Sequence, residues 1–516
     1  MNTSTVTNSS LTSALSTPNA TSTRLGWTGG PNNRGTIDII WNCAITMFLC
    51  CWSILIVNVP NPGSSFLQIQ CQKFYLLSLC GLAPEIVFQI ALGQFLAARR
   101  SRAAFRAAGY KEWGLRHSFY LNMGALHLKT PDFKSFPIDA EQLLYLIQCK
   151  YVEYPQINED VIRDKNKIDG MLRFITLTQA MWFFVNIAAR AVQNLAISCI
   201  ELSTSAWVIF CLGITICWSK KPADVEFPEF IETKTPLADI LKKGGPKART
   251  PYSNTPLDFI NRDEWPWSKL WHHGLVYLRS SRLVRADSSR PIQRFGDTCG
   301  PAVEGWWYML FAAITIGYFA VFIAAWNFSF PSPTERLLWR IAAIAGPTSA
   351  IGFALSMHFC LIWYPKFKER HHNGSASSSS QQAVGQPQSD PEGSHTAAAL
   401  DPAQPATAVM TKQMSKTIEL TQTSSSRQTL SSSVLSRKLP FPRRIILHII
   451  TRIRNNSTLK DPQLDCPLRM IVLTWFFGLW YCLARGFIAI EDLMELRSLP
   501  ASSYQTVDWT AFWPHA

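Results

Sequence analysis

The sequence is poor in charged residues. Asp, Glu, Lys and Arg make up 16% of the 516 residues, against about 25% in an ordinary soluble domain. Apolar residues make up 47%, and there are 19 Trp and 30 Phe. Such an aromatic content is typical of membrane proteins, which carry aromatic belts at the two membrane interfaces. The composition therefore argues against a soluble enzyme and predicts a helical protein embedded in a membrane.

The chain also lacks the short motifs of several common chemistries. The patterns GxSxG, GxxxxGK[ST] and HExxH do not occur, which argues against a serine hydrolase, a P-loop nucleotide site and a zinc protease. The 13 Cys include no CxxC pair and no Cys/His cluster with zinc spacing. Many of them stand inside apolar runs, as small buried residues do. We expect no metal site, no cofactor and no disulfide framework.

Acidic residues are outnumbered, and the net charge is +14. A basic balance can indicate a nucleic-acid partner. Here, however, the basic residues lie mostly in loops that flank apolar segments, which is the positive-inside pattern of membrane proteins. The expected partner is therefore membrane lipid, and no nucleic acid is expected.

Seven segments are apolar over the length that a membrane-spanning helix needs. The third and fourth are separated only by AARAVQN at 188–194, so a tight hairpin must form there for the count to hold. The sequence thus predicts an all-α polytopic membrane protein with about seven transmembrane helices. The predicted spans are 36–59, 74–98, 172–189, 195–218, 306–328, 340–364 and 470–490.

The segments outside the spans differ in character. A polar tail at 1–35 has no apolar core of the signal-peptide type. The loops at 99–170 and 219–305 contain Trp, Phe and Tyr, so we expect them to be ordered on the cytoplasmic side. The loop at 365–469 contains a Ser-rich low-complexity stretch that cannot bury a core and is expected to be disordered. The last span and a C-terminal tail occupy 470–516.

The loop charges and the tail give conflicting indications of orientation. Basic residues in AARRSRAAFRAAGYKEWGLRH, which follows the second span, and in the two later loops favour a cytoplasmic location for all three. With seven spans, the N-terminus would then be cytoplasmic and the C-terminus would lie across the membrane. The glycosylation sequons at Asn2, Asn8 and Asn19 would require a lumenal N-terminus instead. The loop charges carry more weight, because sequons arise by chance in a tail rich in Ser, Thr and Asn.

Acidic residues inside the predicted spans are the first candidates for chemistry, because a charge in the bilayer is costly. Glu85 lies about 16 Å into the second span, with Gln89 on the same face of the helix. Pro84 is expected to kink this helix and to free a backbone carbonyl one turn earlier. Glu201 lies in LAISCIELSTSAWVIF and, like Glu85, is expected near mid-depth. For these two acids a structural role and a catalytic role both remain open.

The other acids lie near the ends of spans. Asp38 begins the first span, and Glu491 and Asp492 close the last, with Arg485 seven residues earlier. Hydrogen bonds or ion pairs between helices are the ordinary role for acids in such positions.

Three further features indicate chemistry only weakly. The run NEDVIRDKNKID at 158–169 has the look of an Asp-rich diphosphate site, but its interleaved basic residues favour a solvated helix. His358 is a lone histidine without a partner motif. Polar residues at Asn186, Arg190 and Gln193 could line a transport path, yet no repeated halves of the kind found in secondary transporters are visible.

Several stretches together resemble a large group of fungal polytopic membrane proteins, most of them without an assigned function. Some integral-membrane terpene cyclases of fungal meroterpenoid pathways, of the macrophorin and ascofuranone type, are similar to this group. The stretches are PNNRGTIDIIWNC (31–43), LAPEIVFQIALGQFLAARRS (82–101), WGLRHSFYLNMGAL (113–126), KSFPIDAEQL (134–143) and YCLARGFIAIEDLMELRSLPASSYQTVDWTAFWPHA (481–516).

The resemblance implies cyclisation of a farnesyl chain carried by an aromatic or epoxycyclohexenone head. Such a reaction starts by protonation of an epoxide or a terminal alkene, without a metal, and needs one general acid in a dry apolar cavity. The implied substrate is a lipophilic prenylated molecule, and the implied location is the endoplasmic reticulum. The implied site comprises Glu85 and Glu201 as candidate acids, Glu491 and Asp38 as partners or proton acceptors, and Phe88, Gln89, Trp182 and Trp207 as the cavity wall.

A different class of function accounts for the same residues. In a transporter or a membrane scaffold without catalysis, the buried acids would serve as proton relays or as ion pairs between helices. The two functions predict different arrangements, because convergence of Glu85 and Glu201 on one closed aromatic pocket would favour catalysis.

Overall fold

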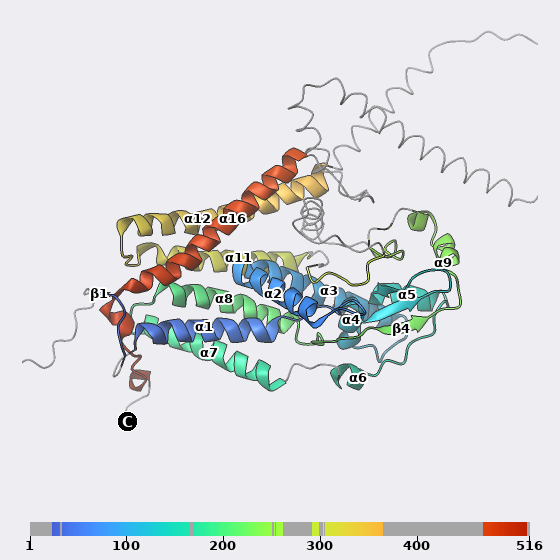
Figure 1. Ribbon diagram of the computed structural model, residues 1–516, viewed down its shortest axis with the longest axis horizontal. Coiled ribbons are helices and arrows are strands. Elements are labelled where there is room, and N and C mark those ends of the chain that lie inside the picture. Colours follow the sequence, from blue (N-terminus) through green and yellow to red (C-terminus); the bar gives the residue numbers. More distant parts are fainter. Residues whose placement is uncertain are drawn as a thin grey trace, which may run out of the picture. The chain divides into compact units, whose positions relative to one another are not determined.

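The computed structural model describes residues 23–30, 34–164, 170–249, 252, 254–261, 291–298, 303, 305–364 and 468–512. Most of these residues are helical, and six helices are long and apolar enough to cross a membrane (Figure 1). A helical polytopic fold is therefore supported, although as six such helices and one broken pair. The six helices are α1 (Thr36–Ile54), α7 (Gly170–Val192), α8 (Cys199–Cys217), α11 (Trp306–Ala324), α12 (Pro333–His358) and α16 (Leu468–Met494).

The second predicted span is not one kinked helix. It consists of α2 (Phe66–Leu82) and α3 (Pro84–Ala107), and the direction of the helix axis bends by 115° from the first to the second. Ala83 between them has φ −143° and ψ 71°, outside the helical region. Pro84 has no N–H for the preceding turn and is well suited to the first position of a new helix. Glu85 therefore lies in the first turn of α3, beside a break in the chain.

The predicted hairpin between the third and fourth spans is confirmed. Helix α7 ends at Val192, and α8 begins at Cys199. Asn194 in the connection has a φ of 54°, a left-handed conformation that Asn tolerates better than most residues. Because α8 begins at Cys199, Glu201 lies in its first turn, and the prediction of a mid-depth position for Glu201 is wrong.

One end of the helix bundle, here called the Arg34 end, is defined by contacts among helix termini. Backbone carbonyls of Ser502 and Ser503 accept hydrogen bonds from Arg190 at the end of α7. Glu495, just past α16, accepts one from the backbone N–H of Cys199 at 2.7 Å. The antiparallel pair of β1 (Thr23–Leu25) and β5 (Ser498–Pro500) adjoins the same segments.

The opposite end, here called the Lys221 end, is equally well defined. Arg173 near the start of α7 donates to the backbone oxygen of Ser219 beyond α8. The Lys221 ammonium donates to the backbone oxygen of Ile56, just after α1, at 3.1 Å. Helices α1 and α8 thus run from the Arg34 end to the Lys221 end, and α7 runs in the opposite direction.

A small α/β unit follows α3 at the Lys221 end. Its sheet has the order β3–β2–β4, with β2 and β3 antiparallel and β2 and β4 parallel. It has its own buried core, in which the rings of Phe105 and Trp113 stack at 3.8 Å. The elements are α4 (Leu115–Asn122), β2 (Leu126–Lys129), β3 (Phe136–Ile138), α5 (Ala140–Gln148), α6 (Glu159–Asp164), β4 (Glu229–Glu232) and α9 (Leu237–Lys243).

The structure describes this unit over 99–164, where the sequence predicts an ordered loop, and its short strands are an addition to an otherwise helical chain. Short 3-10 and π-helical turns complete the described chain, at Pro246–Arg249, Ala325–Asn327, Phe359–Trp363, Glu495–Arg497, Ala501–Tyr504 and Thr510–Phe512. The Ser-rich stretch at 371–437, the motif DEWPWSKLWHH and the three N-terminal sequons lie outside the described residues.

Lys221 provides a test of the packing at its end of the bundle. Its ammonium is buried 4.5 Å from the centre of the Trp218 ring, and burial lowers the pKa of Lys221 to about 7. The unfolded chain therefore holds one proton more than the folded chain between pH 7 and about 10.5, so stability should rise with pH across this window. We expect thermal unfolding in detergent to show a slope that approaches about 1.4 kcal/mol per pH unit above pH 7.5. Lys221→Met should remove this slope; an equal slope in both proteins would contradict the assignment.

Gly213 in α8 allows the ring of Phe88 to approach closely. A Cβ at this position would lie 2.7 Å from the Phe88 ring, whereas a Cβ at Gly317 in α11 would meet nothing within 4 Å. We expect Gly213→Ala to cost about 1–3 kcal/mol of stability, as overpacking of a core does. Gly317→Ala should be neutral or stabilising, since alanine favours helix. Thermal unfolding of the two variants checks this, and equal stabilities would contradict the packing described.

Candidate functional site

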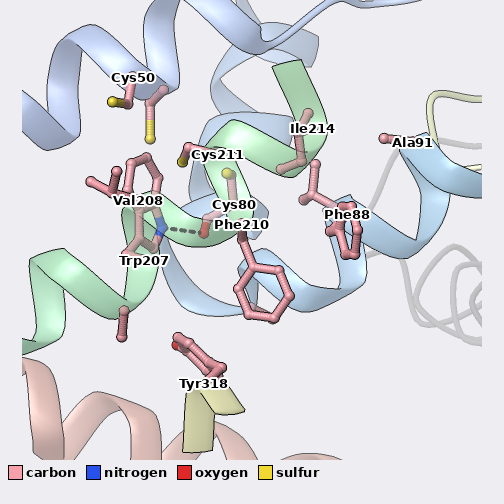
Figure 2. Close-up of a cluster of buried hydrophobic side chains, with 14 of the residues drawn as sticks. Cys50, Cys80, Phe88, Ala91, Trp207, Val208, Phe210, Cys211, Ile214 and Tyr318 are labelled. Carbon is pink, nitrogen blue, oxygen red and sulfur yellow. Dashed lines mark hydrogen bonds between the residues drawn. The ribbon is translucent and has the colours of Figure 1, made fainter. Parts of the chain in front are cut away.

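The break between α2 and α3 is held by two side chains from other helices. Pro84 leaves the backbone oxygen of Cys80 without its helical donor, and the indole N–H of Trp207 donates to it at 3.0 Å (Figure 2). The Arg485 side chain donates to the backbone oxygen of Leu82 at 3.4 Å. The backbone oxygen of Cys80, which the sequence predicted to be free, thus accepts a hydrogen bond from α8. The backbone oxygen of Leu82, at the end of α2, accepts one from α16.

Glu85 lies against this break and is 7% exposed. Its Oε1 accepts a hydrogen bond from the hydroxyl of Tyr481 on α16. The guanidinium of Arg485, one turn further along α16, interacts electrostatically with Glu85. A carboxyl, a phenol and a guanidinium from helices far apart in the sequence therefore meet in the apolar interior.

Three polar atoms of this group make no well-aligned hydrogen bond among the described residues, although the Tyr318 hydroxyl lies beside the Arg485 guanidinium. They are Oε2 of Glu85, the hydroxyl of Tyr318 on α11, and Nη1 of Arg485. Each such buried atom costs about 1–3 kcal/mol, and native proteins rarely leave several together. A carboxyl, a hydroxyl and a cationic donor close together would suit one polar group of a ligand. We call the group of Glu85, Tyr318, Tyr481 and Arg485 the buried acid site.

Aromatic rings surround the buried acid site unevenly. The guanidinium of Arg485 lies 5.2 Å from the centre of the Tyr318 ring and 4.8 Å from that of Phe322, so it covers both rings. Phe88, one turn after Glu85, packs on Phe210 at 5.6 Å (Figure 2). It also packs on Phe311, at 6.0 Å. The rings around Phe88 belong to the buried apolar core, and Phe210 joins them to Tyr318 at 4.9 Å.

Buried thiols lie on the other side of the break. The thiol of Cys80 contacts those of Cys51 and Cys211 in the apolar core beside Trp207. Across the described ranges, no three His, Cys, Asp or Glu side chains are arranged to hold a metal ion. These cysteines behave as small buried residues, as their place in apolar runs indicates.

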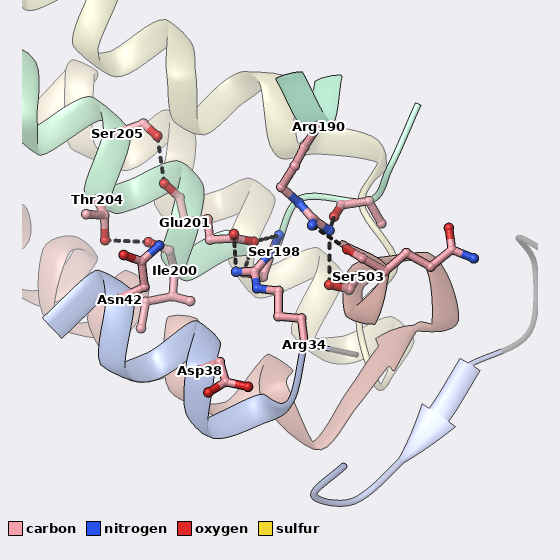
Figure 3. Close-up of polar contacts among 12 residues, drawn as sticks. Arg34, Asp38, Asn42, Arg190, Ser198, Ile200, Glu201, Thr204, Ser205 and Ser503 are labelled. Carbon is pink, nitrogen blue, oxygen red and sulfur yellow. Dashed lines mark hydrogen bonds and ion pairs between the residues drawn. The ribbon is translucent and has the colours of Figure 1, made fainter. Parts of the chain in front are cut away.

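Glu201 has a different environment, at the Arg34 end (Figure 3). Its Oε1 forms an ion pair with Arg34. Its Oε2 accepts hydrogen bonds from the backbone N–H of Ser198 at 3.0 Å and from the Ser198 hydroxyl at 2.7 Å. This is a capping box at the start of α8. With both oxygens engaged, Glu201 has the features of a structural residue, and it makes no contact with Glu85.

The remaining polar residues at this end form a buried network. The Arg190 guanidinium donates to backbone oxygens of Ala196, Ser502, Ser503 and Gln505 (Figure 3). Asp492 accepts a hydrogen bond from Ser203 at 3.0 Å and interacts electrostatically with Arg485. Arg190, proposed from sequence as part of a transport path, is thus committed to holding the C-terminal segment.

The other residues predicted from sequence lie apart from the buried acid site. Asp38 caps α1, with Oδ2 accepting from the backbone N–H of Gly35 at 2.8 Å. Glu491 is buried on α16, where it interacts electrostatically with Glu335 and Arg497 at the Arg34 end. Trp182 is 50% exposed and stacks on Trp509, so it belongs to the surface of the described bundle. Gln89 is half-buried, one turn after Glu85 on α3.

Tyr318 and Tyr481 were not predicted from the sequence, and Arg485 was given no role in the site. Tyr481 and Arg485 stand four residues apart in YCLARG, so they lie on one face of α16. A Tyr and an Arg at helical spacing inside an apolar segment were the available signal, because polar residues at membrane depth usually face the bundle interior.

Comparison with known proteins adds little on function. The model of a family of unknown function (DUF8562) matches residues 9–241, a range that includes Glu85, Glu201 and Lys221 but not Tyr318 or α16. No curated protein matches the chain. No solved structure matches it either.

Proposed function

We propose that the chain is an integral-membrane enzyme of the endoplasmic reticulum that cyclises a lipophilic prenylated aromatic, with Glu85 as the proton donor. The observation that carries the proposal is the group of unpartnered polar atoms around Glu85 in an apolar interior. A single polar group on an otherwise apolar ligand would satisfy them. The resemblance to membrane-bound terpene cyclases of fungal meroterpenoid pathways supplies the substrate class, a farnesylated phenol or epoxycyclohexenone.

The proposed reaction is an isomerisation. The carboxyl of Glu85 gives its proton to the epoxide oxygen or terminal alkene of the farnesyl chain, and the carbon–oxygen bond or the π-bond breaks as the first ring bond forms. The last carbocation then returns a proton to Oε2 of Glu85, or a hydroxyl of the substrate captures the carbocation and gives its own proton to Oε2. Either ending leaves substrate and product with the same mass and needs no further reactant.

The other residues have distinct proposed parts. Tyr481 holds the carboxyl in place through Oε1 and leaves Oε2 to face the substrate. Arg485 stabilises the carboxylate after proton transfer, and Phe88 with its neighbouring rings provides π-faces for the cation, each worth about 0.5–2 kcal/mol. The helices around them exclude water, which would otherwise capture the cation.

The test is turnover by membranes that contain the full chain. Microsomes from yeast expressing the protein are incubated with a farnesylated phenol carrying a terminal epoxide, and products of unchanged mass are followed by chromatography. Cyclised product that is absent from control microsomes supports the proposal. Failure to convert both the epoxide and the corresponding alkene, with folded protein present, would overturn it.

A proton-coupled transporter is the second candidate, favoured by one observation. Ionisable residues continue from the buried acid site to the Arg34 end, since Arg485 interacts electrostatically with Asp492, and Glu495 with both Asp492 and Glu201. Such a series could carry a proton over part of the bundle. Acidification of proteoliposomes driven by a substrate gradient, without chemical conversion, would favour this function.

A further inference from the structure

The two helices α2 and α3 enter the bundle and leave it at the same end. Lys73 on α2 forms an ion pair at 2.8 Å with Asp224, which follows α8. Gln94 on α3 accepts a hydrogen bond at 3.0 Å from Lys221, three residues before Asp224. Each of these two residues is about ten positions from the break, which is about 15 Å of helix. Both arms therefore extend toward the Lys221 end.

The break itself lies halfway along the bundle. Trp207, which donates to Cys80 at the break, is near the middle of α8, and Trp218 at the end of α8 donates to Gln94. The distance along α8 from Trp207 to Trp218 equals that along α3 from the break to Gln94, about 15 Å. In a membrane about 30 Å thick, the chain would reach the middle and turn back. The free backbone groups at the turn are satisfied by protein, as such a turn requires.

We infer that α2 and α3 form a re-entrant hairpin, so that the described chain crosses the membrane six times. Helices α1, α7, α8, α11, α12 and α16 then alternate in direction, and the described segments at both extremes, Thr23–Leu25 and Ser498–Pro500, lie at the Arg34 end. Seven crossings would instead place the first and last of these segments on opposite sides. Their pairing as strands excludes that arrangement.

The distribution of Lys and Arg indicates which end of the bundle faces the cytoplasm. Of the 49 Lys and Arg in the chain, the connecting segments at the Arg34 end carry three, which are Arg24, Arg34 and Arg497. Adding Arg336 and Arg340 in the first turns of α12 and Arg190 in the last turn of α7 gives six. The Lys221 end has the Arg-rich continuation of α3 and Lys220 and Lys221 directly after α8. By the positive-inside rule the Lys221 end faces the cytoplasm and the Arg34 end faces the lumen.

This orientation assigns a modification. The sequons at Asn2, Asn8 and Asn19 lie outside the described residues but precede Thr23 in the chain, so the inferred orientation predicts that they accept N-linked glycans. The sequons at Asn373, Asn455 and Asn456 also lie outside the described residues. Because α12 begins at the Arg34 end, where Glu335 pairs with Arg497, and these sequons follow α12 in the chain, the same orientation predicts that they stay unmodified. The conflict between loop charges and N-terminal sequons disappears, because both now indicate the same orientation. This inference needs membrane insertion but no catalytic activity.

The experiment compares removal of the three N-terminal sequons with removal of the three sequons between α12 and α16. The full chain is expressed in yeast in an Asn327→Gln background, because Asn327 is a further sequon in the turn between α11 and α12 at the Arg34 end. Three chains are compared before and after peptide N-glycosidase treatment: this parent, a triple Asn2→Gln, Asn8→Gln, Asn19→Gln variant, and a triple Asn373→Gln, Asn455→Gln, Asn456→Gln variant.

We expect the enzyme to increase the mobility of the parent and of the second triple variant, and to leave the first triple variant unchanged. Loss of the shift in the second triple variant would overturn the orientation. If the mobility of the parent does not change, a chain with three added sequons on an N-terminal tag is tested next. If that tag also remains unmodified, the N-terminal side is cytoplasmic and the re-entrant hairpin is refuted.

Discussion

Glu85→Gln is expected to reduce cyclised product by at least about 100-fold while the protein still accumulates in the membrane. The amide has nearly the shape of the carboxyl and can still accept a hydrogen bond from Tyr481 through its oxygen, but it has no proton to give. General acid catalysis contributes about 10²–10⁴-fold to a rate. The measurement is product formed per amount of folded protein, with folding judged by detergent-solubilised chromatography and thermal unfolding.

The matched control is Glu491→Gln. Glu491 is also a buried carboxyl on the membrane-length helices with one oxygen unpartnered in the described part of the chain, but it lies toward the Arg34 end. It should retain activity within a few-fold. If Glu85→Gln and Glu491→Gln lower product equally, the loss reflects the helices in general, and Glu85 is not the acid. Tyr481→Phe should fall between the two, because it leaves the carboxyl in place but less well oriented.

The break in the second span could be predicted from the sequence, whereas its fold-back could not. Pro84 indicated where the helix would be interrupted and that the carbonyl one turn earlier would need a donor. The direction of the second arm depends on Lys73 with Asp224 and on Gln94 with Lys221, contacts between residues more than 100 positions apart. Composition alone counts such a pair of arms as one span, and the expected side of the N-terminus depends on that count.

Glu201 shows a signal that was present but not used. Ser198 followed three residues later by Glu201, before an apolar run, is the sequence signature of a capping box and marks the start of a helix. Placing the start of α8 there would have moved Glu201 from mid-depth to the helix terminus. The three-stranded sheet had no comparable signal, since its strands are three or four residues long and depend on pairing with distant segments.

Arg34→Met is expected to destabilise the protein by about 3–5 kcal/mol, the cost of leaving one member of a buried ion pair alone. Glu201 is 1% exposed, and Arg34 provides the hydrogen bond to its Oε1. Removing both charges in Arg34→Met with Glu201→Gln should recover most of this loss, because the amide oxygen can still accept from the backbone of Ser198 and no buried charge remains. Thermal unfolding in detergent of the two single variants and the double variant gives the coupling directly.

The control for this cycle is the pair of Arg497 with Glu335 at the same end of the bundle, in which the Arg497 side chain is 45% exposed. Arg497→Met should cost no more than about 1 kcal/mol, as exposed pairs do. The cycle also separates the two candidate acids. If Glu201 is structural, Glu201→Gln within the stabilised double variant should turn over substrate at close to the wild-type rate. A double variant that is stable but inactive would identify Glu201 as the acid in place of Glu85.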